Sequence, residues 1–127
     1  MRSMVLIAGM ALAGCSANEV RGPQINPGFV RELAGRVAGP PQTCISTFGN
    51  QNVRVIDART LAYGSGRMIY VSQLQSACPA LSPHNGIIVE RDGSQLCRGD
   101  RVRGVEPGAI IPGPICIVQD WVPHRTR

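Results

Sequence analysis

The clearest β signal in the sequence is the stretch GIIVERDGSQLC, residues 86–97. Apolar residues flank Asp92-Gly93 on both sides, and Asp-Gly suits the two positive-φ positions of a type I′ hairpin turn. The stretch therefore predicts an antiparallel hairpin in which a strand over 86–90 turns back at Arg91–Ser94 into a strand that begins at residue 95.

Similar short segments, rich in β-branched residues and bounded by turn residues, recur on both sides of this hairpin. A spacing near ten residues per strand is typical of an antiparallel sandwich or a small barrel. We therefore expect a mainly β fold, a small antiparallel β-barrel or sandwich with two disulfides. The expected strands are 43–48, 53–57, 67–74, 86–90, 95–102 and 115–122.

The segment VEPGAIIPGPIC, residues 105–116, holds three prolines and the apolar pair Ile110-Ile111. Proline cannot donate a ladder hydrogen bond, so this segment is expected to be a loop that joins the last two strands. We expect the two isoleucines to fold back over the core. If they are exposed instead, they are the best candidate for a contact with a partner.

A short helix is expected before the first strand. Asn26 can cap it and Pro27 suits its first position, while Phe29, Leu33 and Val37 recur on one helical face. Gly39-Pro40-Pro41 should end it.

The N-terminal segment has the form of an export signal. A short basic opening precedes an eleven-residue apolar run, Met4–Gly14, which as a helix would span only about 16 Å, too short to cross a bilayer. Leu12-Ala13-Gly14-Cys15 resembles the bacterial lipobox, in which the cysteine thiol is lipidated and the chain is cut before it. Cys15 would then attach the protein to the membrane, and Ser16 favours the outer membrane in the sorting rule that this resemblance implies.

This interpretation divides the chain into a signal peptide at 1–14, a lipidated Cys15 with a tether to residue 28, and a single small β domain with a leading short helix at 29–127. The polar, proline- and glycine-containing residues 16–28 are typical of a flexible tether.

Four cysteines remain: Cys44, Cys78, Cys97 and Cys116. They lack the close C-x-x-C pairs that present zinc ligands, so two disulfides in an oxidising compartment are expected, with no metal and no cofactor. The preferred pairing is Cys78–Cys97 with Cys44–Cys116, which presumes that the first and last strands meet in a closed sheet. Cys44–Cys78 with Cys97–Cys116 is the rival.

All 13 basic residues are arginine, against 8 acidic residues, and the formal net charge is +5. The arginines are dispersed and are not interleaved with stacking aromatics, so the sequence does not favour nucleic-acid binding. The basic balance suits an anionic envelope component or an acidic envelope protein, although arginine-only usage is also typical of GC-rich genomes.

No catalytic motif of a known hydrolase class stands out, and we expect no enzyme activity. His84 lies in the turn-like segment LSPHNG, and a triad of Ser82, His84 and an aspartate is not excluded by spacing. His124 lies near the C-terminus, where chains tend to fray. Asp57 and Asp100 are expected to cap local backbone N–H groups, which also explains the RGD tripeptide at 98–100 better than cell adhesion does.

Residues 43 to the end resemble an uncharacterised family of short proteobacterial lipoproteins, recorded as a domain of unknown function. The resemblance implies an envelope location and this fold but brings no catalytic residues, and Trp121 stands where the family pattern has phenylalanine. The matching positions are Cys44-Ile45, Asp57, Thr60-Leu61, Tyr63, Gly66, Tyr70, Leu74, Cys78-Pro79, Leu81, Leu96-Cys97, Asp100, Cys116, Trp121 and Pro123.

These observations predict a lipid-anchored lipoprotein of the bacterial cell envelope, in the inner leaflet of the outer membrane and facing the periplasm. It would be a non-catalytic binding or structural module. The alternative is an inhibitor of an envelope-attacking hydrolase, but an inhibitor of a basic lysozyme should be acidic, whereas this chain has a pI of about 9.4.

Overall fold

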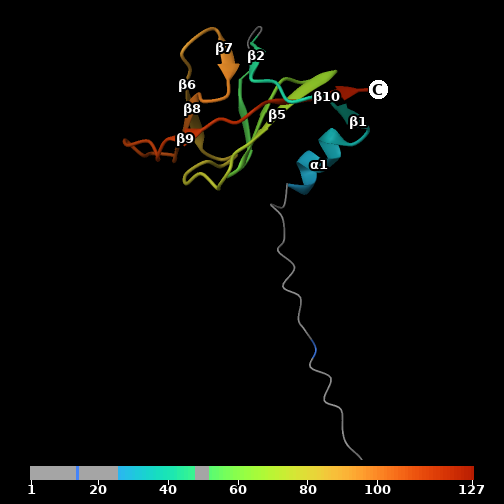
Figure 1. The fold of residues 1–127 in the computed structure, drawn as a ribbon. Helices are drawn as coiled ribbons and strands as arrows, with labels where there is room; N and C mark the ends of the chain where they lie inside the picture. Colours follow the sequence, from blue (N-terminus) through green and yellow to red (C-terminus); the bar gives the residue numbers. More distant parts are fainter. Residues whose placement is uncertain (1–13, 15–25, 48–51) are drawn as a thin grey trace, which may run out of the picture.

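The computed structural model describes residue 14, residues 26–47 and residues 52–127. One helix and ten strands are present in these residues (Figure 1). They are α1 (Pro27–Leu33), β1 (Arg36–Ala38), β2 (Cys44–Ser46), β3 (Arg54–Asp57), β4 (Thr60–Tyr63), β5 (Met68–Gln73), β6 (Gly86–Glu90), β7 (Gln95–Cys97), β8 (Arg101–Val105), β9 (Cys116–Ile117) and β10 (Val122–Thr126).

The strands form three antiparallel sheets. The largest has the order β1-β10-β5-β4-β3, and the others are β2-β7 and β6-β8-β9. The expected mainly β class with antiparallel sheets and two disulfides is confirmed. The sheets do not close into a barrel, and the arrangement is sandwich-like.

Two apolar clusters lie on opposite faces of the five-stranded sheet. The alternation along β5 decides which residue faces which cluster: Ile69 and Val71 pack with Phe29 of α1, whereas Tyr70 packs on the main core. This sheet is therefore covered on one face by α1 and on the other by the main core. Buried members of the main core include Ile45, Leu61, Leu74, Leu81, Leu96, Val102, Val118 and Trp121.

Helix α1 begins as expected and ends earlier than expected. The Asn26 side chain accepts a hydrogen bond from Gly28 N at 2.8 Å, Phe29 is buried, and Leu33 packs against the same cluster. Gly35 has φ +76°, so the chain leaves the helix there. Val37 therefore lies in β1, 49% exposed, and the prediction that it extends the apolar helical face is wrong.

The helix is held against the edge of the large sheet by an ion pair. Arg54 of β3 donates to both carboxylate oxygens of Glu32, at 2.8 and 3.3 Å. This two-pronged geometry is the strong form of the arginine–carboxylate contact. It fixes α1 over β3 and β4.

The predicted hairpin across Asp92-Gly93 is wrong, although the strand over 86–90 is confirmed. β6 pairs with β8 over five residue pairs, whereas β7 leaves that sheet and pairs with β2, placing Cys44 opposite Cys97. The expected strand at 95–102 is broken because Gly99, at φ +95°, turns the chain between β7 and β8. This break lets Leu96 enter the main core beside Ile45.

The disulfides differ from both expected pairings. Cys44 bonds Cys97 and Cys78 bonds Cys116. The expected Cys44–Cys116 bond required the first and last strands of the domain to meet in a closed sheet. Because the sheets stay open and β2 lies beside β7, the third possible pairing forms instead.

Candidate functional site

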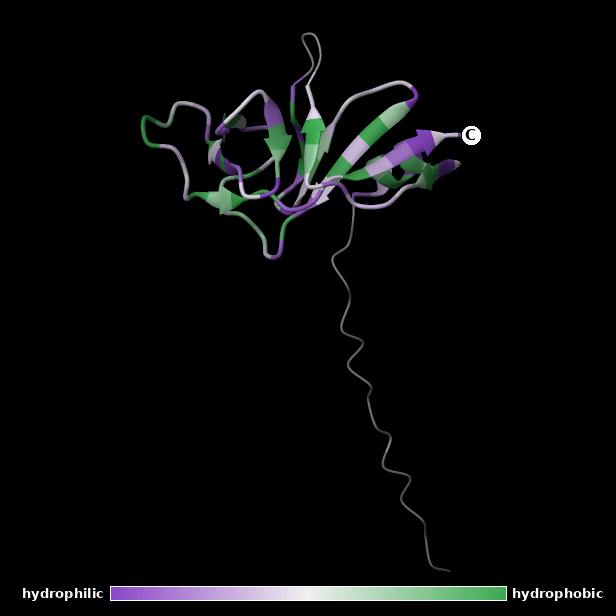
Figure 2. Cartoon of the chain, turned by 45° about the horizontal axis from the view of Figure 1, so that its top comes forward, coloured by the Kyte–Doolittle hydropathy of each residue, from purple (hydrophilic) through white to green (hydrophobic). Residues whose placement is uncertain are grey.

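The segment between β8 and β9 is a loop whose apolar tip points into solvent. We call residues 106–114 the β8–β9 loop; it projects at the end of the domain opposite α1 (Figure 1). The expectation that this segment is a loop is confirmed. Ile110 is 97% exposed and Ile111 is 82% exposed, so the expectation that they fold back over the core is wrong. Figure 2 shows the hydrophobic tip of this loop at the left of the molecule.

A tight turn leads into this tip. Ala109 N donates to Glu106 O at 3.0 Å across Pro107-Gly108, and Gly108 has φ +78°. Proline followed by a positive-φ glycine is the signature of a type II turn, because proline fixes the first central φ and glycine adopts the second without strain. The turn fixes the direction in which Ile110 and Ile111 leave the sheet.

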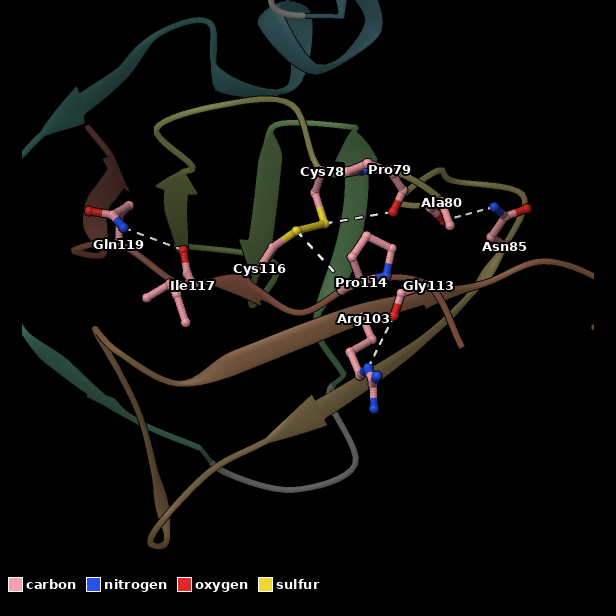
Figure 3. Close-up of a disulfide and its surroundings, with 10 residues drawn as sticks. All are labelled: Cys78, Pro79, Ala80, Asn85, Arg103, Gly113, Pro114, Cys116, Ile117 and Gln119. Atoms are coloured by element: carbon pink, nitrogen blue, oxygen red, sulfur yellow. Dashed lines mark hydrogen bonds between the residues drawn. A yellow bond between two sulfur atoms is a disulfide. The ribbon is translucent and has the colours of Figure 1, made fainter. Parts of the chain in front are cut away.

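The base of the loop is held by the sheet and by a neighbouring segment (Figure 3). Gly113 N donates to Gly104 O at 2.8 Å, and Arg103 Nε donates to Gly113 O at 3.1 Å. A Cβ atom on Gly113 would lie 2.8 Å from Ala80 Cβ, so this close approach requires glycine.

The Cys78–Cys116 disulfide ties the end of the loop to the 78–81 segment (Figure 3). That segment is itself held, because Asn85 Nδ2 donates to Ala80 O at 2.8 Å. The isoleucines are thus exposed at the tip of a loop with both ends fixed.

The sheet surface beside the loop adds apolar area. Because Val102 is buried, its β8 neighbours Arg101 and Arg103 lie on the outer face, with Ile88 and Ile117 as their strand partners. Both isoleucines are close to half exposed. The charge of Arg101 is offset by Glu90 at 3.1 Å and by Asp92 at 3.7 Å. This face is therefore partly apolar, and Arg103, which donates to Gly113 O, keeps a positive charge without a carboxylate partner among the described residues.

The chain matches the model of a protein family. A model of a family of unknown function, DUF6491, matches residues 1–121. The chain belongs to DUF6491. No curated protein and no solved structure matches the chain.

Membership in DUF6491 confirms the expected resemblance at the level of a family of unknown function. The lipobox residues Leu12, Ala13 and Cys15, together with Ser16, lie outside the described residues, as does the tether up to residue 25. The last two residues of the expected tether, Pro27 and Gly28, belong to α1. No helix within the described part of this DUF6491 chain is long and apolar enough to cross a membrane.

The two aspartates singled out in the sequence cap turns, as expected. Asp57 Oδ1 accepts a hydrogen bond from Arg59 N at 2.8 Å. Asp100 Oδ2 accepts one from Cys97 N at 2.8 Å, and the residue is buried. The carboxylate of the RGD tripeptide is thus engaged by its own turn and is withdrawn from solvent.

The two histidines have different surroundings. His84 N donates to Ser82 Oγ at 3.3 Å, which is a local turn contact, and the His84 ring makes no hydrogen bond to any residue of the described ranges. His124 does not lie in a frayed end, because β10 is an inner strand and His124 is paired with both Ala38 and Ile69. Burial and the nearby Arg36 guanidinium lower the pKa of His124 below its ordinary value of 6.5.

A groove beside α1 was not predicted from the sequence. Its volume is about 610 Å³. Its walls come from α1, β5, β10 and two turns that are far apart in the chain, so no local motif marks it. Within residues 26–47 and 52–127, no group of three or more His, Cys, Asp or Glu side chains is placed to hold a metal ion.

Proposed function

We propose that this protein is a lipid-anchored lipoprotein of the bacterial cell envelope that acts as a non-catalytic binding module facing the periplasm. The proposed anchor is the lipidated Cys15, and the Cys15→Ala variant tests it. The contact with the partner is made by Ile110 and Ile111. The observation that carries the proposal is the near-complete exposure of two adjacent isoleucines on a loop held at both ends.

Exposure of these side chains has an energetic consequence. Burying an isoleucine side chain is worth about 1.5–3 kcal/mol, so the pair offers several kcal/mol to a partner that covers it. Part of that gain offsets the loss of freedom on binding, and a loop already held in one conformation loses less than a flexible one. A fixed apolar tip therefore suits a binding surface better than an unconstrained loop would.

The surroundings of the tip favour a protein partner. An apolar pocket on another envelope protein matches two isoleucines, and the outer face of β6, β8 and β9 extends the apolar surface around them. Arg101 is already paired with Glu90 and Asp92, and Arg103 has no carboxylate partner among the described residues, so a single unpaired arginine is left here for an anionic envelope component.

Inhibition of an envelope-attacking hydrolase is the second candidate. A fixed loop with an apolar tip also fits the active-site cleft of an enzyme. The basic pI of about 9.4 argues against a basic lysozyme as the target, because the two charges would repel.

The test is capture of partners from chemically crosslinked envelopes with the lipidated full chain. Changing Ile110→Ser with Ile111→Ser should reduce capture at least tenfold, since the pair would be the centre of the contact. The matched control is Val30→Ser with Val37→Ser, which changes two half-exposed residues at the other end of the domain. Equal capture by the two double variants would contradict the proposal.

The same experiment separates the two candidates. A captured envelope protein without hydrolytic activity supports the binding module. A captured hydrolase whose activity falls on addition of the wild-type chain, but not of the Ile110→Ser, Ile111→Ser variant, supports the inhibitor.

A further inference from the structure

The groove beside α1 exists because the helix is shorter than the sheet it covers. A helix of seven residues is about 10 Å long, whereas the six residues of β5 span about 20 Å. Helix α1 covers the sheet face near Ile69. Further along β5, toward Gln73, the face forms the floor of the groove, and Val71 there is 5% exposed.

One half of the groove is lined by apolar side chains. Phe29 and Leu33 of α1 form a wall, and the adjacent pair Val71 and Val122 lies in the floor. His124 continues the same face of β10, and its lowered pKa keeps the imidazole neutral at neutral pH. None of the apolar lining side chains at this end carries a charge, and the Arg36 guanidinium lies near His124.

The other half is cationic. Arg59, from the β3–β4 turn, donates through Nε to Leu74 O at 2.7 Å, and its terminal nitrogens make no hydrogen bond within the described residues. Arg98, from the β7–β8 turn, donates to Asp120 at 3.2 Å and is half exposed, with further N–H groups available. Two guanidinium groups thus face a single carboxylate, which leaves one net positive charge at this end.

We propose that this groove binds a medium- or long-chain fatty carboxylate, with the acyl chain along Val71 and Val122 and the carboxylate at Arg59 and Arg98. The volume of about 610 Å³ lies within the usual range of small-molecule sites. The guanidinium group is the side chain best matched to a carboxylate. The site lies at the opposite end of the domain from the β8–β9 loop and does not rest on the function proposed for that loop.

The floor of the groove favours an acyl chain over a peptide. β5 and β10 are paired with each other along this face, so they present no free strand edge to a peptide backbone. A peptide lying on apolar side chains would leave its own N–H and C=O groups unpaired, which is costly. An acyl chain has no such groups.

The test is photocrosslinking of the full chain, held in phosphatidylcholine nanodiscs, with a diazirine derivative of dodecanoate. We expect labelling of α1 residues 27–33 and of Val122, competed by unlabelled dodecanoate and not by dodecanol. Arg98→Gln should reduce labelling about tenfold, because a charged hydrogen bond is lost. The matched control, Arg91→Gln, removes the same charge outside the groove and should label like the wild type.

The proposal would be overturned by labelling confined to the Ile110–Ile111 tip, by equal competition by dodecanol, or by unchanged labelling of the Arg98→Gln variant. Stronger competition by an apolar peptide than by dodecanoate would also overturn it, in favour of a peptide site. The thermal unfolding midpoint of Arg98→Gln should match that of Arg91→Gln, which shows that a loss of labelling is not a loss of fold.

Discussion

Asp100 is a buried charged residue in the turn between β7 and β8. Its carboxylate accepts the Cys97 N–H, its own N–H donates to Cys97 O at 3.1 Å, and its carbonyl accepts the Val118 N–H at 2.9 Å. The turn at 97–100 is thereby tied to the strand segment that precedes β10. The Asp100 side chain thus caps the turn at Cys97, while its backbone groups join this turn to Cys97 and Val118.

Replacing Asp100 with Ala should lower the free energy of unfolding by about 1–3 kcal/mol, because the part-buried Cys97 N–H loses its partner. Asp92→Ala is the control, since the Asp92 side chain is 87% exposed and its contact with Arg101 is long. Urea unfolding followed by circular dichroism measures both. If the two variants lose the same stability, Asp100 is not the cap described here.

The lowered pKa of His124 makes the free energy of unfolding depend on pH. Its pKa is lowered in the folded state, first by burial and then by Arg36, so the unfolded state takes up a proton more readily. Stability should therefore fall as the pH drops from 6.5 toward the folded-state pKa. His124→Gln should remove this part of the pH dependence. Thermal unfolding of both proteins between pH 7.5 and pH 5 tests this, and an unchanged difference in stability across that range would argue against it.

At the scale of elements, the sequence predicts those features that depend on interactions between residues close together in the chain. Glycine, proline and capping residues act within a few positions, so the start of α1, the strand at 86–90 and the β8–β9 loop follow from sequence. Strand pairing is not local. Asp92-Gly93 has the sequence of a hairpin turn, but β6 instead pairs with β8 over five residue pairs.

The missed strand β4 has a similar explanation. All four of its residues, Thr60–Tyr63, are buried, so the strand lacks the alternation of apolar and polar residues that marks a half-exposed strand. The prediction that Ile110 and Ile111 fold back over the core is wrong for a related reason. Apolar residues usually fold inward, and only the hydrogen bonds and disulfide at the base of the loop hold these two outward. The α1 groove could not be foreseen, since it assembles from six separate segments.

The Cys78–Cys116 disulfide should control the β8–β9 loop in particular. Removing it with Cys78→Ala and Cys116→Ala should cost roughly 4 kcal/mol in the chain-entropy treatment, and removing Cys44–Cys97 should cost about the same, because the closed loops are of similar length. Only the first change should speed hydrogen exchange at residues 106–114. Equal exchange in both double variants would show that the disulfide does not hold the loop.

Peptide mapping without reduction tests the pairing itself. Trypsin separates all four cysteines, since arginines lie between each pair in the chain. We expect the peptide with Cys44 joined to that with Cys97, and Cys78 joined to Cys116. A peptide joining Cys44 to Cys116 or to Cys78 would contradict the β2–β7 pairing as well.

At the scale of the whole molecule, the proposed anchor and the proposed partner contact lie at opposite ends of the chain's course through the domain. Helix α1 lies at one end of the domain, while the β8–β9 loop projects from the opposite end (Figure 1). A module attached to the membrane at one end and binding at the other places its partner away from the bilayer. The groove lies at the α1 end.

The proposed anchor is tested by Cys15→Ala in the full chain. We expect an uncleaved precursor or a soluble form, and loss of metabolic labelling with an alkyne fatty acid, because only the thiol can form the thioether. Cys44→Ala controls for loss of a cysteine elsewhere. A Cys15→Ala protein that stays with the membrane fraction and keeps its label would show that the anchor is assigned to the wrong residue.

The central claim is that the tip of the β8–β9 loop contacts a partner in the envelope, and site-specific photocrosslinking in intact cells tests it most directly. A photoreactive amino acid is placed at position 110 of the full chain and, in a second protein, at position 30 on the exposed side of α1. We predict a discrete crosslinked product of constant mass from position 110 and none of that mass from position 30. No product from position 110, with the same product formed from position 30, would contradict the claim.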